Sequence, residues 1–425
     1  VLAALLVVAG LGAGGWALFG PSSTGDDEAA ERPPHRTRTE LAWSEDVEAP
    51  DEGVLATPGT WFTDAHAVKA QAERVVALGL ADGERDWSFP LDGTLCGTSL
   101  ESAAGRAAVQ HGPGCTELTL LDLDKGRELW TRRLSDPFDP DRFEAGELAV
   151  TRNTVAISSV SGSAVYRISD RKKVYDDGGT ADGCHPVGVR GGEALVARVQ
   201  CGGANAAQVW GFDPETGERA WKWKAPRGLD IAKIVATSPA VVGMQTESSD
   251  GAEFLMRLGD EGREPVKMEM QRQNAYLCSN PTALCTDVVV GDGAVYVPGE
   301  THSSHGDGSA TVNEVIAYDL ETGEVKWSGE PEDKRELAPV ATLDGDLIAY
   351  EKATQEKGGA LLRFDGETGE RSVYERHPVA TSERESDMAD DAVPLLHQGM
   401  FFLAAEEIYG RDSAEEEKSL LAAFR

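Results

Sequence analysis

A short phrase recurs along this chain, and its recurrence constrains the fold more than any single residue does. Residues 317–327 read AYDLETGEVKW and residues 211–221 read GFDPETGERAW, with an aspartate, a Thr-Gly-Glu run and a tryptophan in the same order. A phrase that returns at a regular interval marks a structural unit that the chain builds many times. The interval therefore has to be measured before any copy is interpreted as a binding motif.

The turn glycine of the phrase marks the position of each copy. The markers are Gly83, Gly126, Gly217, Gly262, Gly323 and Gly369, with Arg171 at the same position of one degenerate copy, ISDRKKVY. Successive markers lie 43, 45, 46, 45, 61 and 46 residues apart. A period near 45 residues, filled with short alternating apolar runs, is typical of four-stranded propeller blades. The sequence thus predicts an all-β propeller.

Each copy predicts four strands and one turn of defined chemistry. Within residues 337–376, the runs LAPVATL, DLIAYEKA, ALLRFD and RSVYER are the expected strands A to D. The phrase joins strands C and D, because glycine adopts a positive φ at low cost and Asp or Thr side chains bond to the turn backbone. The residues expected in this role are Asp213, Thr216, Gly217, Asp319, Thr322, Gly323, Asp365, Thr368 and Gly369.

A bulky residue follows each marker by four positions. These residues are Trp87, Trp130, Tyr175, Trp221, Val266, Trp327 and Val373. Because tyrosine and valine also occur there, the position requires bulk more than indole chemistry. We expect these side chains to pack on the outer strand of each blade.

The two ends of the sequence together predict an eighth blade. SLLAAFR, at 419–425, matches strand C of the other copies and stops where a turn and strand D are expected. TELAWSED, at 39–46, has the form of a strand D, and Trp43 precedes Trp87 by one period of 44 residues. An N-terminal strand in the last blade would close the ring and remove an open sheet edge. We therefore predict one eight-bladed propeller over residues 39–425.

The segment before the propeller predicts a membrane anchor and a tether. Residues 1–19 carry no charge, and a helix of that length spans ~29 Å, close to the hydrocarbon core of a bilayer. The alternative is a cleaved signal peptide, whose apolar region is usually shorter and ends in a small-x-small site. Residues 20–38 are rich in proline and charge, as in a flexible linker. A single-pass membrane protein with an extracytoplasmic propeller is the expected arrangement.

The composition excludes one class of partner. Asp and Glu total 73 against 40 Lys and Arg, which gives a formal net charge of -33. Such a surface repels phosphate backbones, so nucleic-acid binding is not expected.

Six cysteines fall in three couples that are close in sequence: Cys96 and Cys115, Cys184 and Cys201, Cys278 and Cys285. An even number in an exported domain favours disulfides. Six free thiols are the structural alternative, and a metal site would need a ligand spacing that these couples lack. Six cysteines allow ~15 pairings, so the sequence does not fix the connectivity.

The phrase resembles the pyrroloquinoline quinone (PQQ) repeat of eight-bladed quinoprotein propellers. It is complete at Ala317, Asp319, Thr322, Gly323 and Trp327. Residues 39–425 as a whole resemble PQQ-binding-like β-propeller repeat proteins of actinobacteria, which carry one transmembrane helix before an extracytoplasmic propeller. This resemblance implies pairing of the cysteines within each of the three couples.

Quinoprotein dehydrogenases carry further features that this sequence lacks. In that family, adjacent cysteines form a disulfide against the quinone, Glu, Asn and Asp hold a Ca²⁺, and an aspartate is catalytic. This chain has no adjacent cysteines, and no segment matches the other residues one by one. We therefore predict no catalytic, cofactor-binding or metal-binding residues and no cofactor.

The expected topology places the long connections on one face. Connections from D to A and from B to C emerge together, opposite the Thr-Gly-Glu turns, and the longest span 274–285, 299–313, 377–391 and 406–419. The leading hypothesis is a non-catalytic scaffold that binds an unidentified protein or envelope ligand through this face. The alternatives are a PQQ-dependent oxidoreductase and the sensor ectodomain of a signalling protein. No oligomeric state is predicted.

Overall fold

The structure is a computed structural model of the whole chain. It describes residues 38–134, 146–159, 162–176, 183–202, 207–246, 251–270, 277, 286–303, 311–389, 391–410 and 417–425. Backbone contacts divide the chain into two units, Val1–His35 and Arg36–Arg425. The predicted membrane helix at 1–19 and all of the predicted linker except Arg38 lie outside the described residues. Within the described part, no helix has the length and apolar character needed to cross a bilayer.

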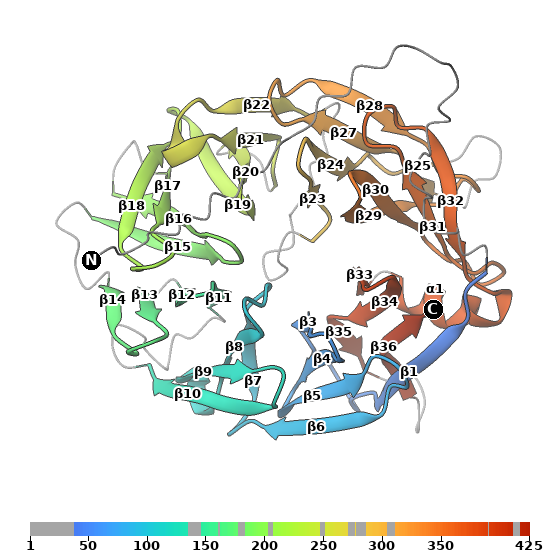
Figure 1. Cartoon of the computed structure of the whole chain (residues 1–425), viewed down its shortest axis with the longest axis horizontal. Helices are drawn as coiled ribbons and strands as arrows, with labels where there is room; N and C mark the ends of the chain where they lie inside the picture. The colour runs from blue at the N-terminus through green and yellow to red at the C-terminus, as the bar shows by residue number, and fades with distance from the viewer. Residues whose placement is uncertain are drawn as a thin grey trace, which may run out of the picture. The chain divides into compact units, whose positions relative to one another are not determined.

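The described strands of the second unit form a ring of eight four-stranded antiparallel sheets, as the sequence predicted (Figure 1). The strands of each blade follow, innermost first. Blade 1 has β3 Thr60–Phe62, β4 His66–Gln71, β5 Arg74–Gly79 and β6 Arg85–Pro90, and blade 2 has β7 Leu95–Thr98, β8 Arg106–His111, β9 Glu117–Asp122 and β10 Arg127–Arg133. Blade 3 has β11 Glu147–Val150, β12 Thr154–Ser159, β13 Gly162–Arg167 and β14 Lys173–Asp176, and blade 4 has β15 Cys184–Arg190, β16 Leu195–Cys201, β17 Ala207–Phe212 and β18 Arg219–Lys224.

The second half of the ring continues the same pattern. Blade 5 has β19 Leu229–Thr237, β20 Ala240–Thr246, β21 Phe254–Leu258 and β22 Val266–Glu269, and blade 6 has β23 Val289–Val290, β24 Ala294–Pro298, β27 Val315–Asp319 and β28 Val325–Gly329, again innermost first. Blade 7 has β29 Leu337–Leu343, β30 Asp346–Glu351, β31 Ala360–Phe364 and β32 Arg371–Arg376, and blade 8 has β33 Ala392–His397, β34 Met400–Ala405, β36 Glu417–Phe424 and β1 Leu41–Glu48. Blade 7 therefore matches the four predicted strands, except that β30 ends two residues early and β31 ends one residue early.

The eighth blade is composite, as predicted from the two ends of the sequence. Strand β1 pairs antiparallel with β36, from Leu41 opposite Phe424 to Glu48 opposite Glu417. The strand begins and ends two residues later than the predicted strand at 39–46. The first and last described strands thus share one sheet, which removes an open seam from the ring.

The repeated aspartates hold the C-to-D turns through the same hydrogen bonds. Oδ1 of Asp319 accepts from the Thr322 amide at 2.8 Å and from the Thr322 hydroxyl at 3.0 Å. Asp213 with Thr216 and Asp365 with Thr368 form the same pair of bonds. These bonds, led by the one from the threonine amide, lower the pKa of Asp213 and of Asp319. Each turn therefore satisfies its own polar groups.

The marker position requires a left-handed backbone. The φ angle is +71° at Gly369 and +75° at Gly323, and Arg171 in the degenerate copy adopts +58°. The other markers, Gly83, Gly126, Gly217 and Gly262, also have positive φ. Arg171 thus takes the glycine conformation despite its side chain, which explains why that copy is degenerate in sequence but regular in fold.

The bulky position does more than the sequence predicted, because its side chain joins one blade to the next. Trp327 of blade 6 donates from Nε1 to the Gly366 carbonyl of blade 7 at 3.1 Å and stacks on Phe364. A Cβ added to Gly369 would lie 2.7 Å from the Trp327 ring. The same packing occurs between Trp43 and Gly83 and between Trp87 and Gly126. The phrase is therefore a contact between blades.

Trp130 and Trp221 also reach the following blade. Trp130 packs edge-on against Tyr166 of blade 3, with ring centroids 6.1 Å apart. Trp221 lies against the apolar cluster of blade 5, and its ring is 3.1 Å from the position of a Cβ on Gly262. Both outer-strand tryptophans thus fill the gap between two sheets.

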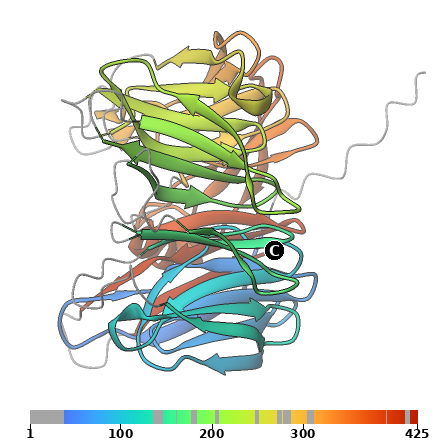
Figure 2. The ribbon, with the colours of Figure 1, turned by 90° about the vertical axis from the view of Figure 1, so that its left-hand side faces the viewer.

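The ring has two faces, and the strands of each blade cross its thickness (Figure 2). The A-to-B and C-to-D connections lie on one side, which we call the turn face. The D-to-A and B-to-C connections lie on the other side, which we call the loop face. Any binding site formed by long connections belongs to the loop face.

Candidate functional site

The loop face carries secondary structure that the repeat does not explain. The connection before β33 contains the 3-10 turn η4 Val379–Thr381 and the helix α1 Ser382–Met388. A two-stranded ribbon joins β2 Val54–Ala56 to β35 Glu407–Tyr409. A second ribbon joins β25 His302–Ser303 to β26 Thr311–Val312 within blade 6. The long segments predicted at 299–313, 377–391 and 406–419 supply most of these elements, although parts of them lie outside the described residues.

Two disulfides cross-link connections on the same face. Cys96 on β7 bonds Cys115 in the connection between β8 and β9, and Cys184 on β15 bonds Cys201 at the end of β16. Both predicted pairings are confirmed. The third couple, Cys278 and Cys285, lies outside the described residues. Each observed disulfide joins the start of strand A to the B-to-C side of the same blade.

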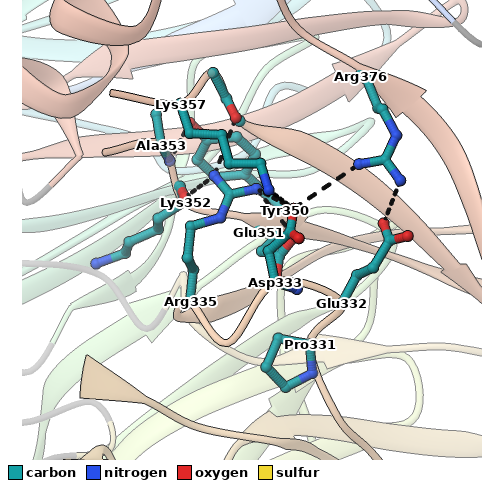
Figure 3. A network of polar contacts seen from close by, with 12 residues as sticks. Pro331, Glu332, Asp333, Arg335, Tyr350, Glu351, Lys352, Ala353, Lys357 and Arg376 are labelled. Atoms are coloured by element: carbon teal, nitrogen blue, oxygen red, sulfur yellow. Dashed lines mark hydrogen bonds and ion pairs between the residues drawn. The ribbon is translucent and has the colours of Figure 1, made fainter. Parts of the chain in front are cut away.

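A network of charged side chains fixes the two long connections of blade 7 (Figure 3). The Arg335 guanidinium donates to Oε2 of Glu351 at 3.0 Å and to the Gly358 carbonyl at 3.0 Å. Glu351 is completely buried and Arg335 is 8% exposed. Lys357 Nζ lies 2.5 Å from Oδ2 of Asp333. The network ties residues 330–336 to residues 352–359.

Three carboxylates of this network lie close enough together to hold a metal ion. Glu332, Asp333 and Glu351 each offer one oxygen within 4.8 Å of the others. Arg376 pairs with Glu332 at 2.6 Å, and the network above places Arg335 and Lys357 on the other two carboxylates. The side chains of the protein thus already supply three positive charges, which satisfies the group without an ion.

Helix α1 is attached to blade 7 by a buried carboxylate. Glu385 is completely buried. Its Oε2 accepts from the Tyr350 hydroxyl at 3.0 Å and from the Gly359 amide at 3.2 Å, and its Oε1 accepts from the Thr381 hydroxyl at 2.6 Å. Because breaking a buried charged network is costly, these bonds hold the helix in one position.

His377 connects the same carboxylate to the composite blade. Its Nδ1 lies 2.7 Å from Oε2 of Glu385, and its ring stacks on Phe424 of β36 at 4.3 Å. Burial disfavours the charged ring, but hydrogen bonds and charges from Glu375 and Glu385 outweigh burial and raise the pKa of His377. The His377 ring is therefore part of the seam between blades 7 and 8.

The ribbon of β2 and β35 rests on a buried lysine. Lys69 is completely buried, and its Nζ donates to the Thr57 carbonyl and to the Thr60 hydroxyl. The Thr57 hydroxyl donates to the Ala405 carbonyl at 2.8 Å. Burial lowers the pKa of Lys69 to about 7, although the Glu406 carboxylate raises it. These hydrogen bonds thus attach the ribbon to blade 1.

Between α1, the ribbon and the composite blade lies an open hollow of about 530 Å³, which we call the acidic groove. Its lining residues are Asp46, Glu383, Arg384, Asp387, Met388, Asp391, Ala405, Glu407, Ile408, Tyr409, Glu417, Lys418 and Ser419. Met388, Ala405 and Ile408 are buried, whereas Tyr409 is 48% exposed. Arg384 crosses from the helix to Asp46 at 2.6 Å. The groove has an apolar floor, an exposed aromatic side chain and an acidic rim.

A second charged cluster is formed by residues of β11, β15 and β19, which are inner strands of the ring (Figure 1), and of the connection between β7 and β8. Arg190 pairs with Glu101 at 2.7 Å, and Lys233 pairs with Glu147 at 3.7 Å. The cavity among these residues is about 10 Å³, enough for a single water. Burial lowers the pKa of Lys233. Each of these two ion pairs joins blades that are separated by one other blade, blade 2 to blade 4 and blade 3 to blade 5.

The sequence indicated the face of the candidate site but missed its components. The length of segments 377–391 and 406–419 predicted elaboration, whereas the helix and the ribbon within them were not predicted. The burial of Glu385 could not be predicted from the sequence, because a glutamate within a charged run is expected to be exposed. The sequence indicated Tyr409 only weakly as a residue of the site, because it is an aromatic residue in an otherwise polar connection.

A protein-family model described as outer membrane protein assembly factor BamB matches residues 36–223 and 116–373 of the chain. Among curated proteins, none matches this sequence.

Solved structures share the fold at low sequence identity. The quinohemoprotein alcohol dehydrogenase ADHIIG from Pseudomonas putida HK5 is 12% identical, with a TM-score of 0.52, over 92% of this chain and 76% of that one. A europium-containing methanol dehydrogenase is 13% identical, with a TM-score of 0.48, over 86% and 84% of the two chains. BamB from Moraxella catarrhalis is 13% identical, with a TM-score of 0.35, over 93% and 97%. At these identities the likeness concerns the fold alone.

Proposed function

Because the chain belongs to the family described as outer membrane protein assembly factor BamB, we propose that it is a non-catalytic binding propeller that engages a protein partner through its loop face. The observation that carries the proposal is the contrast between the two faces. The turn face consists of short connections that satisfy their own hydrogen bonds. The loop face presents a rigid helix, a ribbon and an open groove of about 530 Å³.

The cross-linking of several described connections on the loop face supports a binding role. Long connections lose conformational entropy when a partner orders them, and a surface that is already fixed avoids that cost. Here two disulfides, the Arg335–Glu351 pair and the buried Glu385 fix the connections. Such an arrangement favours recognition of a macromolecule by a preformed surface.

The disulfides also support an extracytoplasmic location. Disulfides persist in oxidising compartments and are rare in the cytosol. We propose that residues 1–19 anchor the propeller to a membrane. The described chain begins beside the turn face, because the Glu40 amide donates to the carbonyl of Arg425, at the C-to-D end of the composite blade.

The enzyme alternative is a quinone-dependent oxidoreductase. The fold is compatible with it, but the residues present do not fit the cofactor. The chain has no adjacent cysteines, and Arg190 and Lys233 of the inner strands are engaged in ion pairs. Titration with PQQ and Ca²⁺, followed by absorbance and by dye-linked alcohol oxidation, separates the alternatives. Stoichiometric binding with turnover would overturn the proposal.

A photo-crosslinking experiment tests the location of the binding surface. The chain offers two exposed apolar positions on opposite faces, Tyr409 on the loop face and Val325 beside a turn. A photoreactive amino acid at position 409 is expected to capture a discrete protein from the cell envelope. The same amino acid at position 325 serves as the matched control. Capture from position 325 alone would contradict the proposal.

A further inference from the structure

We propose that the acidic groove binds a basic peptide segment that places one apolar side chain on its floor. This inference rests on the proposed function and deepens it, because it names the chemistry of the partner. The groove is distinct from the repeated turns and from the second charged cluster.

The charge of the groove selects a cationic partner. Six of its lining residues are acidic and two are basic, a ratio of three to one, compared with 73 to 40 over the whole chain. Glu383 and Asp387 are exposed on the same side of α1, and neither forms an ion pair with any described residue. Complementary charge across an interface speeds encounter and excludes acidic competitors.

The spacing of the carboxylates favours an extended cationic segment over a single metal ion. Among the described residues, the one group of three carboxylates close enough for an ion is in the blade 7 network. No three groove carboxylates of the described part meet that distance. Lysine and arginine side chains spread along a peptide match charges that are distributed around a rim.

The apolar floor of the groove is the reason to expect one apolar side chain in the bound peptide. Met388 and Ile408 are 5% and 3% exposed, and Tyr409 stands beside them at 48% exposure. Tyr409 donates its hydroxyl to Oε2 of Glu407 at 2.9 Å, which fixes the ring at the edge of the groove. Removing an apolar side chain of the partner from water at this position favours binding. Methionine and tyrosine are both frequent in binding surfaces.

The walls of the groove are held in place before any partner binds. Glu385 fixes α1 to blade 7, as described above. Arg384 on the same helix reaches Asp46 of β1 and the hydroxyl of Ser419 on β36. The helix is therefore tied to the composite blade across the groove, so its volume does not depend on the partner.

The test is a titration of the propeller with two labelled peptides. One carries lysines on both sides of a central leucine and phenylalanine, and the other carries glutamates in place of the lysines. Fluorescence anisotropy is expected to show saturable binding of the basic peptide only. Raising the salt concentration from about 50 mM to about 200 mM is expected to weaken binding severalfold.

Matched variants locate the site. Glu383→Lys with Asp387→Lys is expected to weaken peptide binding by ~10-fold or more. Glu321→Lys with Glu324→Lys makes the same charge change on the turn face, where both residues are exposed, and is expected to leave binding within ~2-fold. Tyr409→Ser is expected to weaken binding, whereas Val325→Ser is not. Unchanged melting temperatures show that each variant is folded.

Three results would overturn the inference: no saturable binding, equal weakening by both charge reversals, or saturation of the groove by Ca²⁺ with no peptide binding. Equal weakening would mean attraction to net charge alone. If the peptides fail but position 409 still captures an envelope protein, this inference falls and the proposed function stands. If both fail, both fall.

Discussion

The two faces of this propeller are built from the same blades but follow opposite rules. On the turn face, Asp213, Asp319 and Asp365 accept the same hydrogen bonds in three separate blades. On the loop face, the described connections include one helix, two ribbons and two disulfides, each in a different context. A residue pattern that is repeated from blade to blade therefore reports the architecture of the ring. The features that do not repeat are where a binding function is to be sought.

The largest predicted effect comes from removing the strand that spans both faces. A chain that starts at Ala49 lacks β1 and leaves β36 unpaired along its outer edge. We expect loss of ~5 kcal/mol or more of the free energy of unfolding, comparable with the whole stability of a domain. Thermal unfolding followed by circular dichroism measures it, with a chain that starts at Arg38 as control. Equal melting temperatures would refute the composite blade.

Trp327→Ala is expected to lower the stability of the ring by removing a contact between two blades, without changing the loop face. The side chain is 7% exposed and fills the gap between blades 6 and 7. Replacing a buried tryptophan by alanine costs ~3–5 kcal/mol. Val325→Ala, two residues away and 36% exposed, is the control, with an expected change under ~0.5 kcal/mol. Urea unfolding provides both values, and similar losses in the two variants would show that the tryptophan does not join the blades.

Loss of one disulfide is expected to act on the loop face. Cys96→Ala with Cys115→Ala opens a bridge of sequence separation 19, which the chain-entropy model values at ~3 kcal/mol. Hydrogen exchange is expected to rise in the connections of blade 2 on that face and to stay unchanged in the turns of other blades. Faster exchange in the turns around Asp319 and Asp365 would contradict the separation of the two faces.

The smallest predicted effect, per pH unit, is the pH dependence of the free energy of unfolding that comes from Lys69, the buried lysine beneath the ribbon. Burial lowers the pKa of Lys69 from 10.5 to about 7, so between these values the unfolded chain holds a proton that the folded chain has lost. From this group alone, the free energy of unfolding therefore rises with pH in that window, by about 1 kcal/mol per pH unit.

Variants isolate this contribution from that of His377. The raised pKa of His377 has the opposite sign, since its contribution is lost as pH rises through the folded value. Lys69→Met is expected to remove the rising component measured by urea unfolding between about pH 7.5 and about pH 9. Lys222→Met, on the exposed surface of β18, is expected to keep it. A wild-type slope in Lys69→Met would show that the lysine keeps its proton in the fold.

The repeat predicted the fold well, because blade geometry depends on local patterns. Alternating apolar runs, a turn glycine and a bulky residue sufficed to place the strands of blade 7 and the closing strand around Trp43. The role of Trp327 was only half predicted, since its contact with Gly369 depends on how neighbouring sheets are stacked. The candidate site was harder to predict because it depends on single long-range contacts. Glu385 reaches Tyr350 and Gly359 from 35 and 26 residues away, and no local pattern encodes such a pairing.

In this propeller we expect the loop face to bind a partner and the turn face to hold the blades together. Two antibody fragments separate these roles, one raised against the ribbon that carries Tyr409 and one against the turn around Asp319. Immobilised propeller is exposed to an envelope extract in the presence of each fragment, and the retained protein is quantified. The ribbon fragment is expected to abolish retention, and the turn fragment is expected to leave it intact. Retention blocked by the turn fragment alone would contradict this expectation.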